Sequence, residues 1–190
     1  MSATSPADAQ RFRVLGIAGS LRAASLNRRA LEAMRELRAA TFAVDVRGWL
    51  DAIPPFNEDL EAAGVPAAVA DLRQSVLECD GLLIATPEYN QSIPGVLKNL
   101  IDWLSRGEVS PLAGKPVAIL GVTTGPWGTR LAQAAVRQTL TACGARIMPA
   151  PQIYLREAAP RFDAQGALVD ASTRAQFGQF LDAFHTWIKQ

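Results

Sequence analysis

The chain has 190 residues, and its 19 lysines and arginines against 18 aspartates and glutamates give a formal net charge of +1. With 49% hydrophobic residues, it is long enough to bury a hydrophobic core, and its length suits one domain. The near-neutral charge, without a basic cluster, argues against a nucleic-acid partner and against binding to an anionic membrane surface. The apolar runs are far shorter than the ~20 residues that cross a bilayer.

The first ten residues are small and polar and carry no apolar signal-peptide core, so we expect a cytoplasmic protein. We expect a flexible tail over residues 1–11 and a single domain over residues 12–190. Cys79 and Cys143 stand in no metal-binding spacing, and His185 is the only histidine. The sequence therefore predicts neither a disulfide framework nor a metal site.

Strands and helices alternate along the first part of the chain. Phe12–Ala18 is a short apolar run, as expected of a buried strand. Ser25 can cap a helix over Leu26–Leu37, where apolar residues recur near every 3.6 positions. A second strand is predicted over Phe42–Val46. A loop follows at Pro54-Pro55, because two prolines do not fit inside a helix or a central strand.

The second part of the chain repeats this alternation. Continuous apolar runs predict strands over Gly81–Thr86, Val117–Val122 and Arg146–Met148. Apolar residues at helical spacing predict helices over Val65–Glu78, Ile93–Leu104, Ala132–Cys143 and Phe177–Ile188.

Strands made of continuous apolar runs are buried on both faces, which favours a parallel sheet with helices on both sides. Two doubly wound folds fit such a series, the dinucleotide-binding fold and the flavodoxin-like fold. The first turn lacks the G-x-G-x-x-G fingerprint of the dinucleotide-binding fold. We therefore predict an α/β fold of the flavodoxin-like type, with a doubly wound five-stranded parallel sheet in the order 2-1-3-4-5.

In this strand order, ligands bind beyond the carboxyl ends of strands 1, 3 and 4, where three unusual loops stand. The first loop leads into a helix N-terminus, which suits a phosphate group. Its candidate residues, which include hydroxyl, amide and guanidinium donors, are Ser20, Arg22, Ser25, Leu26 and Asn27. An ordinary capped helix start with a solvated arginine would contain the same residues.

The second and third loops suit a flat ring. The second loop combines a rigid turn, a carboxylate, an aromatic ring and an amide, in Pro87, Glu88, Tyr89 and Asn90. The third loop offers hydroxyl groups and a close backbone approach, through Thr123, Thr124 and Gly125. Each loop alone is also compatible with an ordinary turn. Together they describe a site for a mononucleotide with a large flat base, and FMN fits that description.

The same three segments, GSLRAASLN, TPEYNQSIPGVLKNLIDWLSR and GVTTGPWGTR, resemble the NADPH-dependent FMN reductase family of flavodoxin-like proteins. The middle segment is most similar to the bacterial chromate and quinone reductase branch. The resemblance covers residues 12–150 and, less closely, residues 161–189. It implies that the first loop binds the FMN phosphate through Ser20, Arg22, Ser25 and Asn27. It also implies that residues 87–90 and 123–125 border the flavin ring.

The resemblance further implies an enzyme that uses NADPH or NADH as co-substrate. Bound FMN would take a hydride and pass electrons to a small-molecule acceptor in a ping-pong cycle, the acceptor being a quinone, chromate, an azo dye or free flavin. We predict no catalytic acid or base, with Tyr89 and Glu88 as candidate pocket residues. Glu88 is expected either to organise a subunit contact or to transfer a proton. Family members are usually dimers or tetramers, so a homodimer or homotetramer is expected.

Some positions depart from the family pattern. Gln91 stands where a small residue is common, and Trp127 interrupts a run of small residues, so both are expected to narrow the pocket over the flavin. Trp49 and the segment Ile53–Phe56 are expected to form a lid or an interface. Two other functions stay open: an electron carrier of the flavodoxin type, although such carriers tend to be acidic, and a phosphate-ligand binding protein without redox activity.

Overall fold

A computed structural model describes residues 11–48 and 50–190; residues 1–10 of the predicted tail and Trp49 lie outside the described residues. The strands are β1 (Phe12–Ala18), β2 (Phe42–Arg47), β3 (Gly81–Ala85), β4 (Pro116–Val122), β5 (Arg146–Ile147) and β6 (Ile153–Leu155). The α-helices are α1 (Leu26–Leu37), α2 (Glu58–Ala63), α3 (Ala67–Glu78), α4 (Gly95–Leu104), α5 (Arg130–Ala142) and α6 (Ala171–Ile188). In this part of the chain, none of the helices is both long enough and apolar enough to cross a membrane.

The strands form one parallel sheet in the order β2-β1-β3-β4-β5, which confirms the predicted flavodoxin-like topology. The sheet has six strands rather than the predicted five, because β6 also pairs with β4. β5 pairs with the beginning of β4, through Pro116 and Val117, and β6 pairs with its end, through Leu120 to Val122. Pro149 and Pro151 stand between β5 and β6, and prolines cannot donate the hydrogen bonds that would continue β5.

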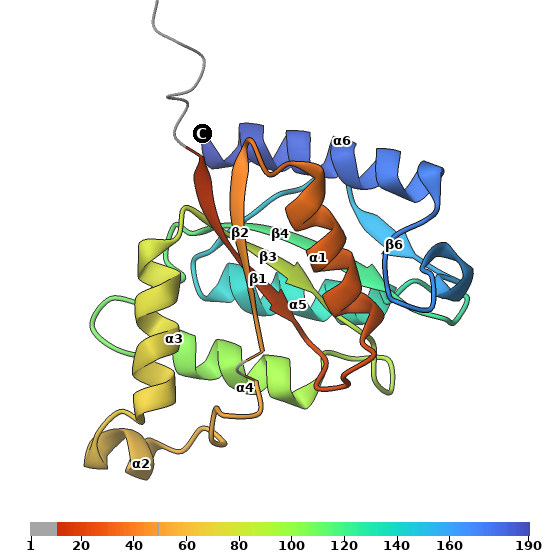
Figure 1. The fold of residues 1–190 in the computed structure, drawn as a ribbon. Coiled ribbons are helices and arrows are strands. Elements are labelled where there is room, and N and C mark those ends of the chain that lie inside the picture. Colours follow the sequence, from red (N-terminus) through yellow and green to blue (C-terminus); the bar gives the residue numbers. More distant parts are fainter. Residues whose placement is uncertain (1–10, 49) are drawn as a thin grey trace, which may run out of the picture.

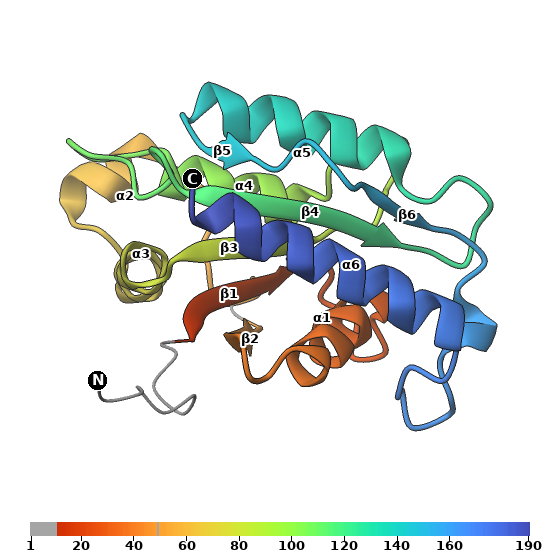
Figure 2. The same ribbon diagram turned by 90° about the horizontal axis from the view of Figure 1, so that it is seen from above.

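Helices cover both faces of the sheet, and each face has its own hydrophobic core (Figures 1 and 2). On one face, α1 and α6 bury Met34, Phe177 and Phe180 against the sheet. On the other face, α3, α4 and α5 bury a second core that includes Leu72 and Trp103. Every residue of β3 and β4 is buried, as continuous apolar strands between two helical layers should be.

Local signals explain most helix ends. The Ser25 side chain accepts a hydrogen bond from the Arg28 backbone, so α1 begins where the sequence predicts. The helix expected from Val65 begins at Ala67, after Pro66 at its N-cap position. The sequence analysis missed α2, which Asn57 caps and which buries no residue in the core. Its signal was the capping asparagine followed by three acidic residues in the first turn.

The segment Ile53–Phe56, which precedes α2, is hydrogen-bonded to α4. The Pro54 carbonyl accepts hydrogen bonds from the Trp103 indole, at 2.8 Å, and from the Asn99 side-chain amide, at 2.9 Å. The Phe56 backbone N–H donates to the Asn99 side-chain oxygen at 2.7 Å. The segment Ile53–Phe56 is thus part of the α4 packing in this structure.

Candidate functional site

Three loops meet at the carboxyl ends of the parallel strands: residues 19–25 after β1, 86–94 after β3 and 123–129 after β4. They enclose a cleft, which we call the loop cleft. Its lining consists of Ser20, Arg22, Ser25, Leu26, Asn27, Pro87, Glu88, Tyr89, Val122, Thr123 and Thr124. The structure therefore brings together all the candidate site residues except Asn90 and Gly125, which do not line the cleft, and adds Val122.

Gly19 lets the first loop lie directly against the second. Its backbone N–H donates to the Ala85 carbonyl at 2.8 Å. A Cβ at this position would stand 3.1 Å from a Leu97 methyl group and 3.2 Å from the Pro87 ring. A side chain at this position would make tight contacts with Leu97 and Pro87, so glycine suits this close approach without needing an unusual backbone angle.

The polar side chains of the first loop have different surroundings. Ser25 is buried and its hydroxyl caps α1, accepting from the Arg28 backbone at 3.3 Å. Asn27 is only 3% exposed, and its amide bonds to the backbone of Val122. The Arg22 side chain is exposed and has no hydrogen-bond or ion-pair partner within residues 11–48 and 50–190. Arg22 is thus the group in this loop that is free to bind an anion.

The second loop folds back on itself in a two-residue turn. Tyr89 and Ser92 exchange backbone hydrogen bonds of 3.2 and 3.0 Å. Asn90 and Gln91, between them, have φ angles of 49° and 63°, so both are left-handed, as in a type I′ turn. Asn90 stands at the exposed tip of this turn, and for that reason it does not line the loop cleft.

Tyr89 connects the second loop to the first. Its phenol donates a hydrogen bond of 3.3 Å to the Ser20 hydroxyl, while 46% of the residue stays exposed. The ring therefore stands at the cleft with a face available to another flat molecule.

Glu88 connects the second loop to helix α5. One carboxylate oxygen accepts hydrogen bonds from the backbone N–H groups of Leu131, at 2.8 Å, and Ala132, at 3.0 Å. Thr129, at the N-cap position of α5, is left-handed and does not cap the helix with its own side chain. Glu88 thus satisfies backbone donors that a helix N-terminus otherwise leaves unpaired. Within this chain, the Glu88 carboxylate therefore acts as a cap of α5.

The third loop is supported by the segment that follows β6. The Thr123 N–H donates to the Leu155 carbonyl at 2.9 Å, and the Thr123 carbonyl accepts from Ala158 at 3.0 Å. The Gly125 carbonyl accepts from the Glu157 backbone at 3.1 Å. The sequence analysis missed this support, although the buried–exposed–buried pattern of Ile153–Leu155 is typical of a strand.

A second hollow, with a volume of about 400 Å³, adjoins the loop cleft and shares Glu88 with it. Its other lining residues are Gln91, Trp127, Arg130 and Leu131. Trp127 is 67% exposed, and the Arg130 guanidinium lies 5.2 Å from the centre of its ring. Gln91 and Trp127 were expected to narrow the flavin pocket. Both line this neighbouring hollow, which we call the tryptophan hollow.

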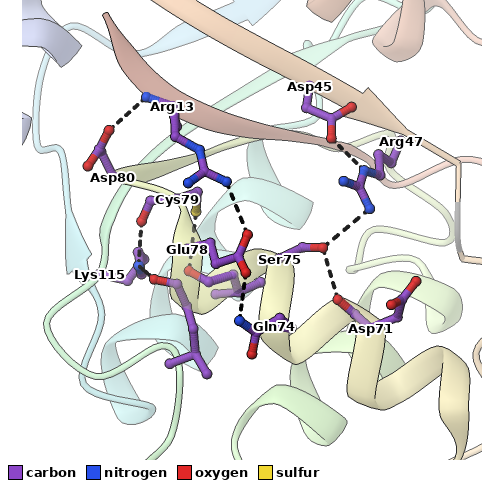
Figure 3. Close-up of polar contacts among 12 residues, drawn as sticks. Arg13, Asp45, Arg47, Asp71, Gln74, Ser75, Glu78, Cys79, Asp80 and Lys115 are labelled. Atoms are coloured by element: carbon purple, nitrogen blue, oxygen red, sulfur yellow. Dashed lines mark hydrogen bonds and ion pairs between the residues drawn. The ribbon is translucent and has the colours of Figure 1, made fainter. Parts of the chain in front are cut away.

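Near the amino ends of β1, β3 and β4, away from the three loops, polar groups bond to one another (Figure 3). Arg13 pairs with Glu78 at 3.1 Å, and its backbone N–H donates to Asp80 at 2.7 Å. Lys115 donates to the Cys79 carbonyl at 2.6 Å, and burial raises the pKa of the Cys79 thiol. Within residues 11–48 and 50–190, no cluster of three or more His, Cys, Asp or Glu side chains could hold a metal ion. The polar groups named here bond to one another, whereas the Arg22 guanidinium in the loop cleft has no partner among the described residues. We therefore take the loop cleft as the candidate functional site.

Comparison with known proteins decides the family. The family model described as NADPH-dependent FMN reductase matches residues 12–160, which is most of the chain. The chain belongs to the NADPH-dependent FMN reductase family.

Individual relatives agree with this assignment. An NAD(P)H-dependent FMN reductase of Pseudomonas aeruginosa is 42% identical over 179 residues, covering 94% of this chain and 96% of the relative. A quinone reductase of Pseudomonas putida is 39% identical over 182 residues, covering 95% and 96%. Among solved structures, the chain is similar to FerB, a flavoenzyme NAD(P)H:(acceptor) oxidoreductase from Paracoccus denitrificans, with a TM-score of 0.87 and 34% sequence identity. The match covers 94% of this chain and 97% of the FerB chain.

As a member of the FMN reductase family, the protein is an oxidoreductase with FMN as cofactor and NAD(P)H as co-substrate. The matched relatives are named as reductases, so the alternative of a flavodoxin-type electron carrier is set aside. The loop cleft fits this cofactor in two respects: the Arg22 guanidinium, which has no partner among the described residues, suits its phosphate, and Tyr89, which is 46% exposed, suits its flat base.

Proposed function

We propose that the loop cleft holds FMN with its phosphate at the first loop. Three observations support this orientation. Ser20, Arg22 and Ser25 stand at the N-terminus of α1, where backbone N–H groups and the positive end of the helix favour an anion. Arg22 has no partner among the described residues that would compete for its guanidinium. Leu26 and Asn27 complete this end of the cleft.

The flavin ring is then proposed to lie between the second and third loops. FMN bound there would supply the hydride and electron transfer between NAD(P)H and the acceptor, and the chain supplies position rather than a reactive group. Tyr89 offers an aromatic face, and Pro87 a rigid wall beside it. Thr123 and Thr124 also line the cleft, and Gly125 follows Thr124 in the chain as Asn90 follows Tyr89. We assign no residue as a catalytic acid or base.

We propose a quinone as the electron acceptor. The single observation that carries this choice is the tryptophan hollow beside the loop cleft. Its volume of about 400 Å³ lies within the usual range for small-molecule sites. The exposed Trp127 and Leu131 side chains give it apolar walls, which suit a neutral flat ring better than a small dianion such as chromate. The Pseudomonas putida relative, which is named a quinone reductase, supports the same choice.

Substitution of Arg22 tests the placement of FMN. Arg22→Ala should weaken FMN binding about tenfold to a hundredfold, since a charged hydrogen bond contributes about 1.5–3 kcal/mol. Flavin fluorescence quenching on titration of the apoprotein measures this dissociation constant. Arg35→Ala is the matched control, because Arg35 lies on α1, the helix that follows the first loop, but pairs with Glu32 at 2.8 Å and does not line the cleft. Equal FMN affinity of the Arg22 variant and the control would refute the proposed orientation.

An acceptor screen tests the quinone. The FMN-loaded protein is assayed with NADPH and with NADH against 1,4-benzoquinone, chromate, an azo dye and free FMN. We expect the highest kcat/KM with the quinone, and a selective loss of quinone turnover in Trp127→Ala. Faster turnover of chromate or the dye would contradict the assignment, and the two nicotinamides show which co-substrate is preferred.

We further propose that residues 12–190 act as one FMN-binding domain in a cytoplasmic homodimer or homotetramer. Apolar side chains with large exposed fractions surround the loop cleft: Leu21 (55%), Tyr89 (46%), Trp127 (67%) and Leu131 (50%). A second copy of the chain would cover such a rim. Light scattering on the purified protein measures the subunit number, and a monomer at micromolar concentration would rule this assembly out.

A further inference from the structure

Glu88 occupies the boundary between the loop cleft and the tryptophan hollow, since it lines both. Its carboxylate accepts the Leu131 and Ala132 N–H groups at 2.8 and 3.0 Å. It is therefore held in place by α5 and cannot swing away without leaving two backbone donors of that helix unpaired. A fixed negative charge thus stands at one wall of the proposed flavin site.

Two opposite charges meet at this wall. A helix N-terminus carries roughly half a positive elementary charge, and the N-terminus of α5 points at the Glu88 carboxylate. Arg130, which lines the hollow next to Glu88, adds a full positive charge. Without Glu88, the cleft would therefore face an uncompensated positive wall. With Glu88, the positive end of the helix is neutralised.

We propose that Glu88 sets how strongly this site holds reduced FMN relative to oxidised FMN. The inference rests on the proposed placement of FMN in the loop cleft. Reduction adds two electrons and one proton to FMN, so the reduced form carries one more negative charge than the oxidised form. A neighbouring carboxylate disfavours that extra charge, whereas the end of α5 and Arg130 favour it. Glu88 thereby keeps the bound flavin a stronger reductant toward its acceptor.

Glu88→Gln is the direct test, because glutamine keeps an oxygen that can accept the helix hydrogen bonds and removes only the charge. The apoprotein is titrated with oxidised FMN and, without oxygen, with dithionite-reduced FMN. We expect the ratio of the two dissociation constants, oxidised over reduced, to rise about threefold to tenfold, or roughly 15 to 30 mV for a two-electron couple. A purely structural role would weaken both forms equally and leave the ratio unchanged.

Arg130→Gln is the complementary variant, and it does not depend on the Glu88 cap. It removes a positive charge from the same wall at an exposed side chain, so the ratio should fall. Asp170→Asn is the matched control. Asp170 also caps a helix N-terminus, that of α6, where its carboxylate accepts from the Thr173 backbone N–H at 2.7 Å. It lines neither the loop cleft nor the tryptophan hollow. Its ratio should equal that of the unmodified protein.

The outcomes separate this inference from the proposed function. If the unmodified protein binds neither form of FMN, the proposed placement itself fails. If it binds both forms and the ratio rises in Glu88→Gln and falls in Arg130→Gln, the role of Glu88 is established. Should Glu88→Gln not fold, an Arg130→Gln ratio below that of the unmodified protein supports the inference. The inference is overturned if every variant that folds has the same ratio of oxidised to reduced dissociation constants as the unmodified protein, within experimental error.

Discussion

Asn27 binds the backbone of Val122 with both ends of its side-chain amide. Its Nδ2 donates to the Val122 carbonyl at 3.0 Å, and its Oδ1 accepts from the Val122 N–H at 2.9 Å. This pair joins the first turn of α1, just after the first loop, to the last residue of β4, just before the third loop. Tyr89 and Ser20 join the first loop to the second, and Glu88 joins the second loop to α5 behind the third. The loop cleft is therefore held by contacts among its loops and the elements that adjoin them.

The first prediction concerns the Asn27 contact. Asn27→Leu leaves the buried N–H and C=O of Val122 without partners, and each unpaired group costs about 1–3 kcal/mol. We expect the free energy of unfolding to fall by about 2–5 kcal/mol, as measured by urea denaturation. Asn27→Asp keeps one of the two hydrogen bonds and should be less destabilised. A loss below 1 kcal/mol in Asn27→Leu would contradict this prediction.

The second prediction concerns Gln91, whose φ angle of 63° suits glycine better than a residue with a Cβ. Left-handed backbone costs a residue other than glycine about 1–2 kcal/mol, while glycine loses slightly more entropy on folding. Gln91→Gly should therefore stabilise the protein by about 0.5–1 kcal/mol, seen as a higher thermal midpoint. Gln91→Ala, which keeps the Cβ, should show no such gain. A Gln91→Gly protein less stable than the unmodified one would refute the prediction.

The strands could be predicted because their signals are local, and their order followed from the choice between two doubly wound folds. Continuous apolar runs such as Gly81–Ala85 and Pro116–Val122 identify buried strands, and the helices between them have clear apolar spacing. The division of the last edge into β5 and β6 could not be predicted. It depends on which part of β4 each short segment pairs with, and that is a tertiary choice.

The candidate site residues were predictable for a related reason: parallel topology places the carboxyl ends of β1, β3 and β4 at one edge. The partners of individual side chains were not. Asn27 meets Val122 across 95 positions of sequence, and Glu88 meets Leu131 across 43. No local pattern indicates such contacts, so the bonds of the Asn27 amide and the Glu88 carboxylate to distant backbone groups could not be predicted.

The third prediction separates cofactor binding from folding at Gly125. A Cβ there would meet only the Thr123 hydroxyl, at 3.6 Å, which is an ordinary contact. Gly125→Ala should therefore change the free energy of unfolding of the apoprotein by less than about 0.5 kcal/mol. If the backbone approaches the flavin closely here, FMN affinity should fall about tenfold. Urea denaturation and FMN titration on one preparation measure both effects.

Gly121→Ala provides the contrasting case for the third prediction. A Cβ at Gly121 would lie 1.6 Å from the Thr129 hydroxyl, so the start of α5 would have to move. This variant should lose stability and FMN affinity together. Unchanged FMN affinity in Gly125→Ala would place the flavin away from that backbone.

The fourth prediction concerns acid stability. A hydrogen bond from the Thr173 hydroxyl, followed by one from the Thr173 backbone, lowers the pKa of Asp170 to about 2. Because the folded state binds this proton less readily than the unfolded state, the stabilisation is present above about pH 4 and is lost as the pH falls toward 2. The stability difference between the unmodified protein and Asp170→Asn should be constant from pH 5 to 7 and shrink below about pH 4.

Urea denaturation of both proteins at several pH values between about 2 and 7 measures this difference directly. Asp170 lies at the start of α6, outside the loop cleft, so FMN affinity at neutral pH should be the same in both proteins. A difference in stability that persists unchanged down to about pH 2 would mean that the Asp170 charge does not contribute. In that case the two side chains differ as caps in their hydrogen bonds rather than in their charge.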